Sequence, residues 1–210
     1  MRIALIHALR HSIAPIEAAF ARLWPEVALQ NLLDDRLSAD LARDGRLTSA
    51  MTERFLTLSR YAAGTGADGL LFTCSAFGPC IEACAEDLAP IPVLKPNEAM
   101  IADAVAQGTR IGLLASFEPT LASMPPEFPD DVTVVPMHAP GALAALDRGD
   151  GAEHDRLAAQ AALALAECDV IALAQFSLAR AADAVAAATG KPVLTTPDCA
   201  VVELRRRLGA

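Results

Sequence analysis

Short apolar runs alternate along the chain with longer stretches of helical periodicity. Seven runs have the length and composition of buried strands: residues 2–8, 67–73, 91–94, 110–115, 132–136, 168–174 and 192–195. The stretches with helical spacing include residues 13–23, 48–63, 97–107, 154–166, 178–188 and 198–208. Strands that alternate with helices indicate βαβ units and a mainly parallel sheet. The pattern therefore predicts an α/β fold.

One pattern occurs twice: an acidic residue, then an apolar strand, then a polar residue at the end of that strand. It matches residues 67–75 with residues 168–176. Two further pairs of segments are similar to one another, 92–95 with 192–195 and 2–7 with 110–115. Three matched pairs in one order predict a duplication. We expect two halves, residues 1–97 with 198–210 and residues 98–197, each a mainly parallel sheet flanked by helices.

The duplication also predicts where a ligand binds. In open parallel sheets, ligands bind beyond the carboxyl ends of the strands. Cys74 follows the apolar run 67–73, and Gln175 stands at the matching position after 168–174. We therefore expect the active site in a cleft between the halves, with these two side chains on opposite sides of it.

Composition excludes several classes of protein. The net charge is −9, and the only lysines are Lys95 and Lys191, so no basic patch for nucleic acid is visible. No apolar run approaches the ~20 residues of a membrane span, and the N-terminus lacks the features of a signal peptide. Five cysteines without a framework spacing predict no disulfides. No glycine-rich dinucleotide motif or P-loop is present. We expect a cytoplasmic protein that contacts neither membrane nor nucleic acid.

Four segments together resemble the aspartate/glutamate racemase superfamily, including its hydantoin racemases, maleate isomerases and arylmalonate decarboxylases. They are Ile6-His7-Ala8, Phe72-Thr73-Cys74-Ser75-Ala76-Phe77, Leu114-Ala115-Ser116-Phe117-Glu118-Pro119-Thr120 and Leu173-Ala174-Gln175-Phe176-Ser177. The resemblance covers essentially the whole chain. It implies an enzyme without cofactor or metal that acts on a small carboxylic acid at the carbon next to the carboxylate. It also suggests a homodimer.

In that family, a cysteine from each half flanks the acidic carbon of the substrate, one removing a proton and the other delivering one. Cys74 matches the first cysteine, but Gln175 stands in place of the second. A carboxamide has no pKa useful for proton transfer near neutral pH. Cys168 and Cys199 do not lie at the expected strand end. This departure argues against racemisation by two thiols.

A site with one thiol leaves several reactions open. Cys74 could racemise with His7 or water as its partner, protonate an enediolate after decarboxylation of a malonate-like acid, or add to an alkene and permit cis–trans isomerisation. Maleate isomerases tend to keep both cysteines, and the decarboxylases of the family keep theirs in the second half. The alternative to an enzyme is a non-catalytic protein that binds a small acid.

The turn after residue 73 carries the first group of candidate residues. A helix start there would lower the pKa of Cys74 and offer backbone N–H groups to a carboxylate. Ser75 resembles the family's ligand for that carboxylate, and Thr73 is either a ligand or a strand residue. His7 ends the first strand and could act as an acid or base, or bind a loop. Lys95 could pair with the substrate or lie exposed.

The second half supplies the remaining candidates. Ser116 and Thr120 lie at the turn that matches the first half, where they bind substrate or cap a helix. Gln175 can donate a hydrogen bond to a carboxylate or enediolate, and Phe176 walls the pocket or packs in the core. Other residues are assigned structural roles: Cys80 and Cys84 to packing rather than metal, and His11, His138 and His154 to the surface or loops.

Overall fold

The computed structural model describes residues 1–210 and divides them into two compact units, residues 1–98 with 200–210, and residues 99–199. The first unit contains one parallel sheet in the order β2-β1-β3-β4. Its strands are β1 (Arg2–His7), β2 (Ala28–Leu33), β3 (Gly69–Phe72) and β4 (Val93–Leu94). Its helices are α1 (Ile13–Leu23), α2 (Leu37–Asp44), α3 (Ser49–Gly64), α4 (Gly78–Asp87) and the end of α10 (Thr196–Arg207). Short 3-10 turns occupy η1 (Arg10–Ser12) and η2 (Ser75–Phe77).

The second unit repeats this plan, with a parallel sheet in the order β6-β5-β7-β8. Its strands are β5 (Arg110–Ala115), β6 (Thr133–His138), β7 (Val170–Leu173) and β8 (Val193–Thr195). Its helices are α5 (Glu98–Gln107), α6 (Glu118–Ser123), α7 (Ala142–Asp147), α8 (Gly151–Ala162) and α9 (Ala182–Thr189). The 3-10 turns are η3 (Pro125–Glu127), η4 (Leu163–Leu165) and η5 (Phe176–Ala181).

The duplication extends to individual hydrogen bonds. In the first sheet the carboxylate of Asp68 accepts a bond from the backbone N–H of Arg2 at 2.7 Å. In the second sheet Asp169 accepts the matching bond from Arg110 at 2.8 Å. These are the acidic residues that precede β3 and β7. The predicted α/β fold with two duplicated halves is therefore confirmed.

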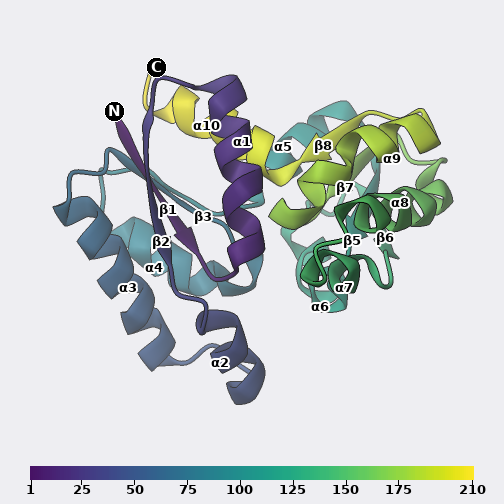
Figure 1. Cartoon of the computed structure of the whole chain (residues 1–210). Coiled ribbons are helices and arrows are strands. Elements are labelled where there is room, and N and C mark those ends of the chain that lie inside the picture. Colours follow the sequence, from purple (N-terminus) through teal and green to yellow (C-terminus); the bar gives the residue numbers. More distant parts are fainter. The chain divides into compact units, whose positions relative to one another are not determined.

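The central strands β1 and β3 of the first sheet are buried on both faces, as strands of parallel sheets generally are. Alternate residues of β1, such as Ala4 and Ile6, face a core built from α3 and α4. On the opposite face, Leu204 of α10 approaches Gly69 closely. Figure 1 shows the strands of this unit with α1 on one side and α3 on the other. The core therefore supports both sides of β3, the strand that leads to Cys74.

The second sheet is covered in the same way. Ile111, Leu113 and Ala115 of β5 face one core with α5, and Leu114 faces another with α8 and α9. Gly112 lies on the α8 side, where Leu165 packs so close that a side chain at this position would crowd it. The close approach of Leu165 to the strand therefore favours glycine here.

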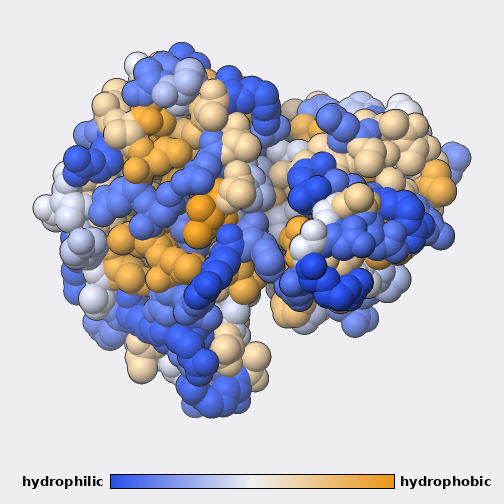
Figure 2. Space-filling model, viewed as in Figure 1, coloured by the Kyte–Doolittle hydropathy of each residue, from blue (hydrophilic) through white to orange (hydrophobic).

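The surface of the first unit is mixed in character. On the face shown in Figure 2, its apolar residues form separate orange areas bordered by hydrophilic residues. The part of this unit where Figure 1 places α2 is mostly hydrophilic. No helix in the structure has both the length and the apolar character that a membrane span requires.

The pattern of apolar runs and helical spacing did not predict several of the observed helices and strands. The strand β2 has no buried residue, and its sequence Ala-Leu-Gln-Asn-Leu-Leu does not alternate cleanly. The short helices α2, α6 and α7 have too few turns to show a helical period. Helix α4 begins with Gly-Pro, which also occurs in loops.

Candidate functional site

Cys74 lies directly after β3, at the edge of the sheet where parallel strands place their ligands. Its backbone is extended (φ −134°, ψ 120°), and it precedes η2 and then α4, which has a proline in its first turn. The side chain is half-buried and packs against the core formed with α3 and α4. The turn between strand and helix therefore fixes the direction of the thiol.

The environment of Cys74 favours the protonated thiol. Burial raises the pKa of Cys74, while hydrogen bonds from the backbone N–H of Ala76 and the hydroxyl of Ser38 lower it in part. The sequence predicted a lowered pKa because a helix begins here, and that expectation is wrong. The reason is that η2 spans only three residues, so its few aligned dipoles do not offset the loss of water.

A chain of hydrogen bonds leads from the neighbour of Cys74 to the surface. His7 is fully buried at the end of β1, and its Nδ1 lies 2.9 Å from the hydroxyl oxygen of Thr73. Its Nε2 lies 2.9 Å from Oδ1 of Asn31 on β2. The amide of Asn31 in turn donates to Glu17 of α1 at 2.7 Å. Side chains from three elements, β1, β2 and α1, thus form the chain of hydrogen bonds that ends at Thr73, beside Cys74.

The bond from Asn31 to Glu17 also settles the tautomer of His7. Because Glu17 accepts from the NH₂ group, the amide oxygen of Asn31 faces His7, whose Nε2 must donate. In the neutral ring Nδ1 then accepts from Thr73. Both nitrogens are engaged, and the ring reaches Cys74 only through Thr73. These contacts suit a positioning role for His7, and its role as an acid or base stays a prediction.

Titration of His7 should be visible in the stability of the fold. Burial lowers the pKa of His7 below 6.5, although Asn31 and Glu17 oppose the shift. The unfolded chain thus binds this proton at higher pH than the folded one, so the contribution of neutral His7 is complete above pH 6.5 and is lost as pH falls below it. We expect urea unfolding to show a steeper loss of stability on acidification for wild type than for His7→Gln. Parallel pH dependences would contradict this.

The structure places Ser75 and Lys95 at the same end of the first sheet. Ser75 begins η2 and is half-buried. Lys95 directly follows β4, and its ammonium lies 2.9 Å from the carboxylate of Glu82 on α4. A substrate carboxylate would compete with Glu82 for Lys95.

In the second unit, Gln175 follows β7 with the same extended backbone as Cys74 (φ −145°, ψ 143°). Its Oε1 accepts three hydrogen bonds from the turn after β5. The donors are the backbone N–H of Ser116 at 2.6 Å, the Ser116 hydroxyl at 3.0 Å and the backbone N–H of Phe117 at 3.1 Å. The carbonyl of Ser116 lies 3.3 Å from Nε2 of His138 at the end of β6. The ends of three strands are thus joined through Gln175 and Ser116.

These bonds orient the carboxamide of Gln175. With Oε1 directed at three donors, its NH₂ group is the end left to bind another molecule. Gln175 is half-buried, so this end is within reach of a ligand. The position that matches Cys74 therefore offers a hydrogen-bond donor and no acid or base.

Other candidates are less accessible. Thr120 is 6% exposed in α6, and Phe176 is 3% exposed in η5. Cys80 and Cys84 are fully buried in the core beneath α4, and no group of three metal-binding side chains occurs anywhere in the structure. His154 was expected on the surface or in a loop, and that is wrong. It lies in α8, fully buried, with Nδ1 at 2.8 Å from Asp155.

Sequence reasoning missed two contributors to the first site. Asn31 lies in the unpredicted strand β2, and Ser38 in the unpredicted helix α2. One signal was available for Asn31. The strand 132–136 was predicted in the second half, and the duplication requires a counterpart beside β1, which is β2.

No protein-family model matches the chain, and neither does any curated protein. Solved structures do match. Allantoin racemase from Klebsiella pneumoniae has 18% identity and a TM-score of 0.76, covering 100% of this chain and 88% of its own. Glutamate racemase from Bacillus anthracis has 14% identity and a TM-score of 0.72, covering 99% and 81%. Unliganded arylmalonate decarboxylase has 19% identity and a TM-score of 0.71, covering 100% and 93%.

The agreement spans both halves of the chain, because each match covers nearly all of its residues. The fold that the resemblance implies is therefore confirmed. At these identities the comparisons establish the shared fold, and the chemistry has to be argued from the residues of this chain.

Proposed function

We propose that this chain, which has the fold of the glutamate and allantoin racemases, is a cofactor-independent enzyme acting at the carbon α to the carboxylate of a small acid. Cys74 is its proton-transfer thiol, and Gln175 replaces the second cysteine of the racemases. The observation that carries this proposal is the turn after β3. There Cys74 lies half-buried at the ligand-binding edge of the sheet, at the position that Gln175 takes after β7 in the second half.

The proposed role of Cys74 is to deliver a proton to carbon. Its raised pKa keeps the S–H bond intact at neutral pH. When a carbanion or enediolate forms on the substrate, the S–H bond breaks, a C–H bond forms, and the electron pair stays on sulfur. The thiolate is then stabilised by the Ala76 N–H and the Ser38 hydroxyl until water returns the proton.

The proposed role of Gln175 is to stabilise the enediolate. Its NH₂ group donates to an oxygen on which negative charge develops, and its fixed orientation requires no rearrangement during the reaction. The proposed substrate ligands also include Thr73, Ser75, Lys95, Ser116, Thr120 and Phe176. The expected cleft, homodimer and cytoplasmic location also stay predictions.

One observation favours decarboxylation of a malonate-like acid as a second candidate. Racemisation in both directions requires one group that removes a proton and another that supplies it. Decarboxylation needs only the supplier, because breaking the C–C bond leaves the electron pair on the substrate. The raised pKa of Cys74 and the carboxamide at position 175 match this simpler requirement.

Proton NMR in D₂O with a panel of small acids would identify the reaction. The panel contains aspartate, glutamate, a hydantoin, maleate and substituted malonates. Deuterium at an α-carbon without loss of CO₂ indicates racemase-type chemistry, and a deuterated product lacking one carboxylate indicates decarboxylation. Saturation-transfer contact with an acid that neither exchanges nor reacts would support the binding protein instead and contradict the enzyme.

Replacement of Gln175 by glutamate tests the donor role. One carboxylate oxygen of Glu can keep the bonds from Ser116 and Phe117, but the other oxygen takes the place of the NH₂ donor. Loss of a hydrogen bond to a charged group should lower kcat/KM by about tenfold to hundredfold. Gln175→Asn is the control that keeps a donor. Full activity in Gln175→Glu would contradict the assignment.

A further inference from the structure

Two exposed apolar side chains occupy matching positions in the two halves. Leu9 lies two residues after β1 and is 42% exposed, and Phe117 lies two residues after β5 and is 47% exposed. The duplication pairs β1 with β5, so Leu9 and Phe117 are counterparts. Both follow the carboxyl end of a strand, where open parallel sheets bind ligands. Single exposed apolar residues are common on protein surfaces, but their repetition at the ligand-binding edge of both sheets indicates a function.

Neither packing nor helix capping explains these two side chains. Phe117 is the N-cap of α6, a position where serine, threonine, aspartate and asparagine are preferred because they accept from backbone N–H groups. Leu9 precedes η1 in the same way, and neither side chain makes a capping bond. Because both side chains are exposed, they add little to the core. Contact with another molecule is therefore the better explanation for an apolar residue at these positions.

Phe117 is in direct contact with Gln175. Its backbone N–H donates to Oε1 of Gln175 at 3.1 Å, next to the bond that Ser116 N–H donates at 2.6 Å. The NH₂ group on the same carboxamide is the one proposed to bind the enediolate. In a substituted acid, only two bonds separate the carboxylate carbon from the first atom of the substituent. Phe117 is thus the exposed apolar residue next to the group proposed to hold the carboxylate.

The first half carries a further exposed leucine at the same edge of its sheet. Leu33 is the last residue of β2, and it is paired in register with His7, the last residue of β1. Side chains of paired residues lie on one face of a sheet, so Leu33 lies on the face where His7 binds Thr73. The carboxyl ends of the first sheet therefore carry two exposed leucines, Leu9 and Leu33.

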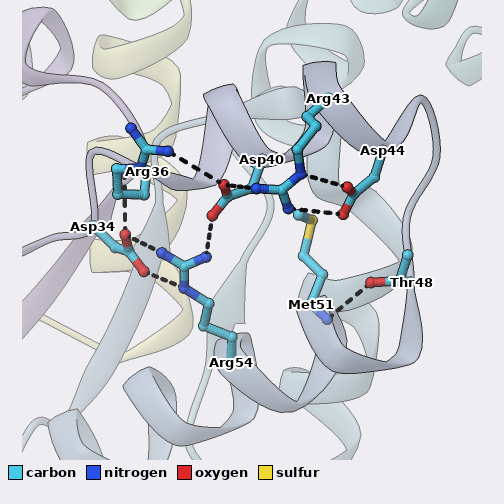
Figure 3. A network of polar contacts seen from close by, with 8 residues as sticks. All are labelled: Asp34, Arg36, Asp40, Arg43, Asp44, Thr48, Met51 and Arg54. Atoms are coloured by element: carbon cyan, nitrogen blue, oxygen red, sulfur yellow. Dashed lines mark hydrogen bonds and ion pairs between the residues drawn. The ribbon is translucent and has the colours of Figure 1, made fainter.

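The carboxylates at this edge of the first sheet are already bound by arginine. Asp34 and Asp35 are the only acidic residues within two positions of a strand's carboxyl end in this half. Arg54 of α3 binds both oxygens of Asp34 at 2.5 Å (Figure 3), and Arg10 binds Asp35 at 2.8 Å. A forked pair of this kind is the strongest arrangement between arginine and a carboxylate. An ammonium group on a substrate would have to compete with a guanidinium for either carboxylate.

The corresponding edge of the second sheet carries no charge. None of the two residues that follow each of its four strands is acidic or basic. The carboxylate nearest to Phe117 in the sequence is that of Glu118, which is exposed in the first turn of α6. An amino acid bound at this edge would therefore have Glu118 as the nearest partner for its ammonium group.

We propose that the substrate is an acid whose α-carbon carries an apolar substituent and no ammonium group. Phe117 in the second half and Leu9 in the first each provide apolar surface for this substituent. The inference rests on the proposed function, which supplies the site, and it adds the substrate class. Apolar surface that is removed from water favours the complex in proportion to its area. An ammonium group in the same place would lose its hydration without gaining a carboxylate.

A homologous series of malonates tests the substrate class. Methyl-, ethyl- and propylmalonate are titrated calorimetrically into Cys74→Ala, in which turnover does not disturb the measurement. Kd should fall by about fourfold for each methylene that becomes fully buried. Aminomalonate, in which an ammonium group replaces a methyl group of nearly the same size, should bind more weakly than methylmalonate. A Kd that is constant along the series, or the absence of binding by every member, would overturn the proposal.

Alanine variants of the two apolar residues, made in the same background, test their roles. Phe117→Ala and Leu9→Ala should each weaken the dependence of Kd on chain length, because each removes apolar surface from the bound alkyl group. The matched controls are Tyr61→Ala and Leu163→Ala, which remove exposed side chains from α3, before β3, and from η4, before β7. Both controls should keep the full dependence. A variant of Phe117 or Leu9 that also keeps it would refute the role of that residue.

Glu118→Gln separates the apolar acid from an amino acid. We expect this change to weaken no member of the series, because none of them depends on a carboxylate of the protein. If aminomalonate instead binds more tightly than methylmalonate, and Glu118→Gln removes that advantage, the substrate carries an ammonium group and the proposal is wrong. Failure of the proposed function would be distinct, because binding to wild type would still depend on chain length while no acid is turned over.

Discussion

Replacing Cys74 with alanine is expected to lower kcat for the substrate found by NMR by about 10²- to 10⁴-fold, the usual contribution of a positioned acid or base. The thiol is the titratable group at the turn after β3, and its neighbour His7 is buried with both nitrogens engaged. We therefore expect no other side chain at this turn to deliver the proton. The measurement is deuterium incorporation or product formation in D₂O.

Controls separate the lost thiol from a disturbed fold. Cys84→Ala removes a cysteine that is fully buried in the same half and should leave kcat unchanged apart from a modest loss of stability. Cys74→Ser keeps the shape of the side chain but raises its pKa far above that of a thiol, so it should be nearly as inactive as Cys74→Ala. Wild-type activity in Cys74→Ser would refute the thiol chemistry.

The pH dependence of the wild type follows from the same environment. If Cys74 acts as the acid, activity requires the S–H form, which predominates below the raised pKa. The rate should therefore be flat through neutral pH and fall only as pH rises above 9.0, the ordinary value for a cysteine thiol. A rate that rises with pH through this range would identify the thiolate as the active form, and would favour proton abstraction over decarboxylation.

The fold could be predicted from the sequence because apolar runs typical of buried parallel strands recur along the whole chain and in both halves. Runs such as 2–8 and 110–115 are apolar on both sides, as strands covered on two faces must be. Asp68 and Asp169 marked the same structural position in both halves. The strand β2 could not be recognised in this way, because its apolar and polar residues do not alternate and none of them is buried.

The sequence predicted where the residues of the candidate site lie. It did not predict the pKa of Cys74 or the hydrogen-bond partners of His7. Cys74 and Gln175 lie at matching strand ends, as the spacing predicts. The raised pKa of Cys74 depends on burial by α2, and the engagement of His7 depends on Asn31. Both come from segments without a periodic pattern, and their contacts exist only after the chain has folded.

Phe55 connects the reactive turn to the core, and its replacement by alanine should cost about 3–5 kcal/mol of stability. The ring is 2% exposed on α3. Its centroid lies 5.2 Å from that of Phe72 and 4.9 Å from that of Phe77, the residues on either side of the turn that carries Cys74. Removing the ring leaves a cavity beneath this turn. The fall in free energy of unfolding, measured by urea titration, is a large part of the roughly 5–15 kcal/mol typical of a protein.

Two further variants on helix α3 serve as controls for Phe55→Ala. Tyr61→Ala removes an aromatic ring that is 58% exposed on α3 and should change stability by no more than about 0.5 kcal/mol. Phe55→Leu fills most of the cavity and should recover much of the loss. Because Phe72 and Phe77 flank Cys74, Phe55→Ala should also accelerate alkylation of the thiol by loosening the turn. If Phe55→Ala is no less stable than Tyr61→Ala, the stacked rings do not support the site.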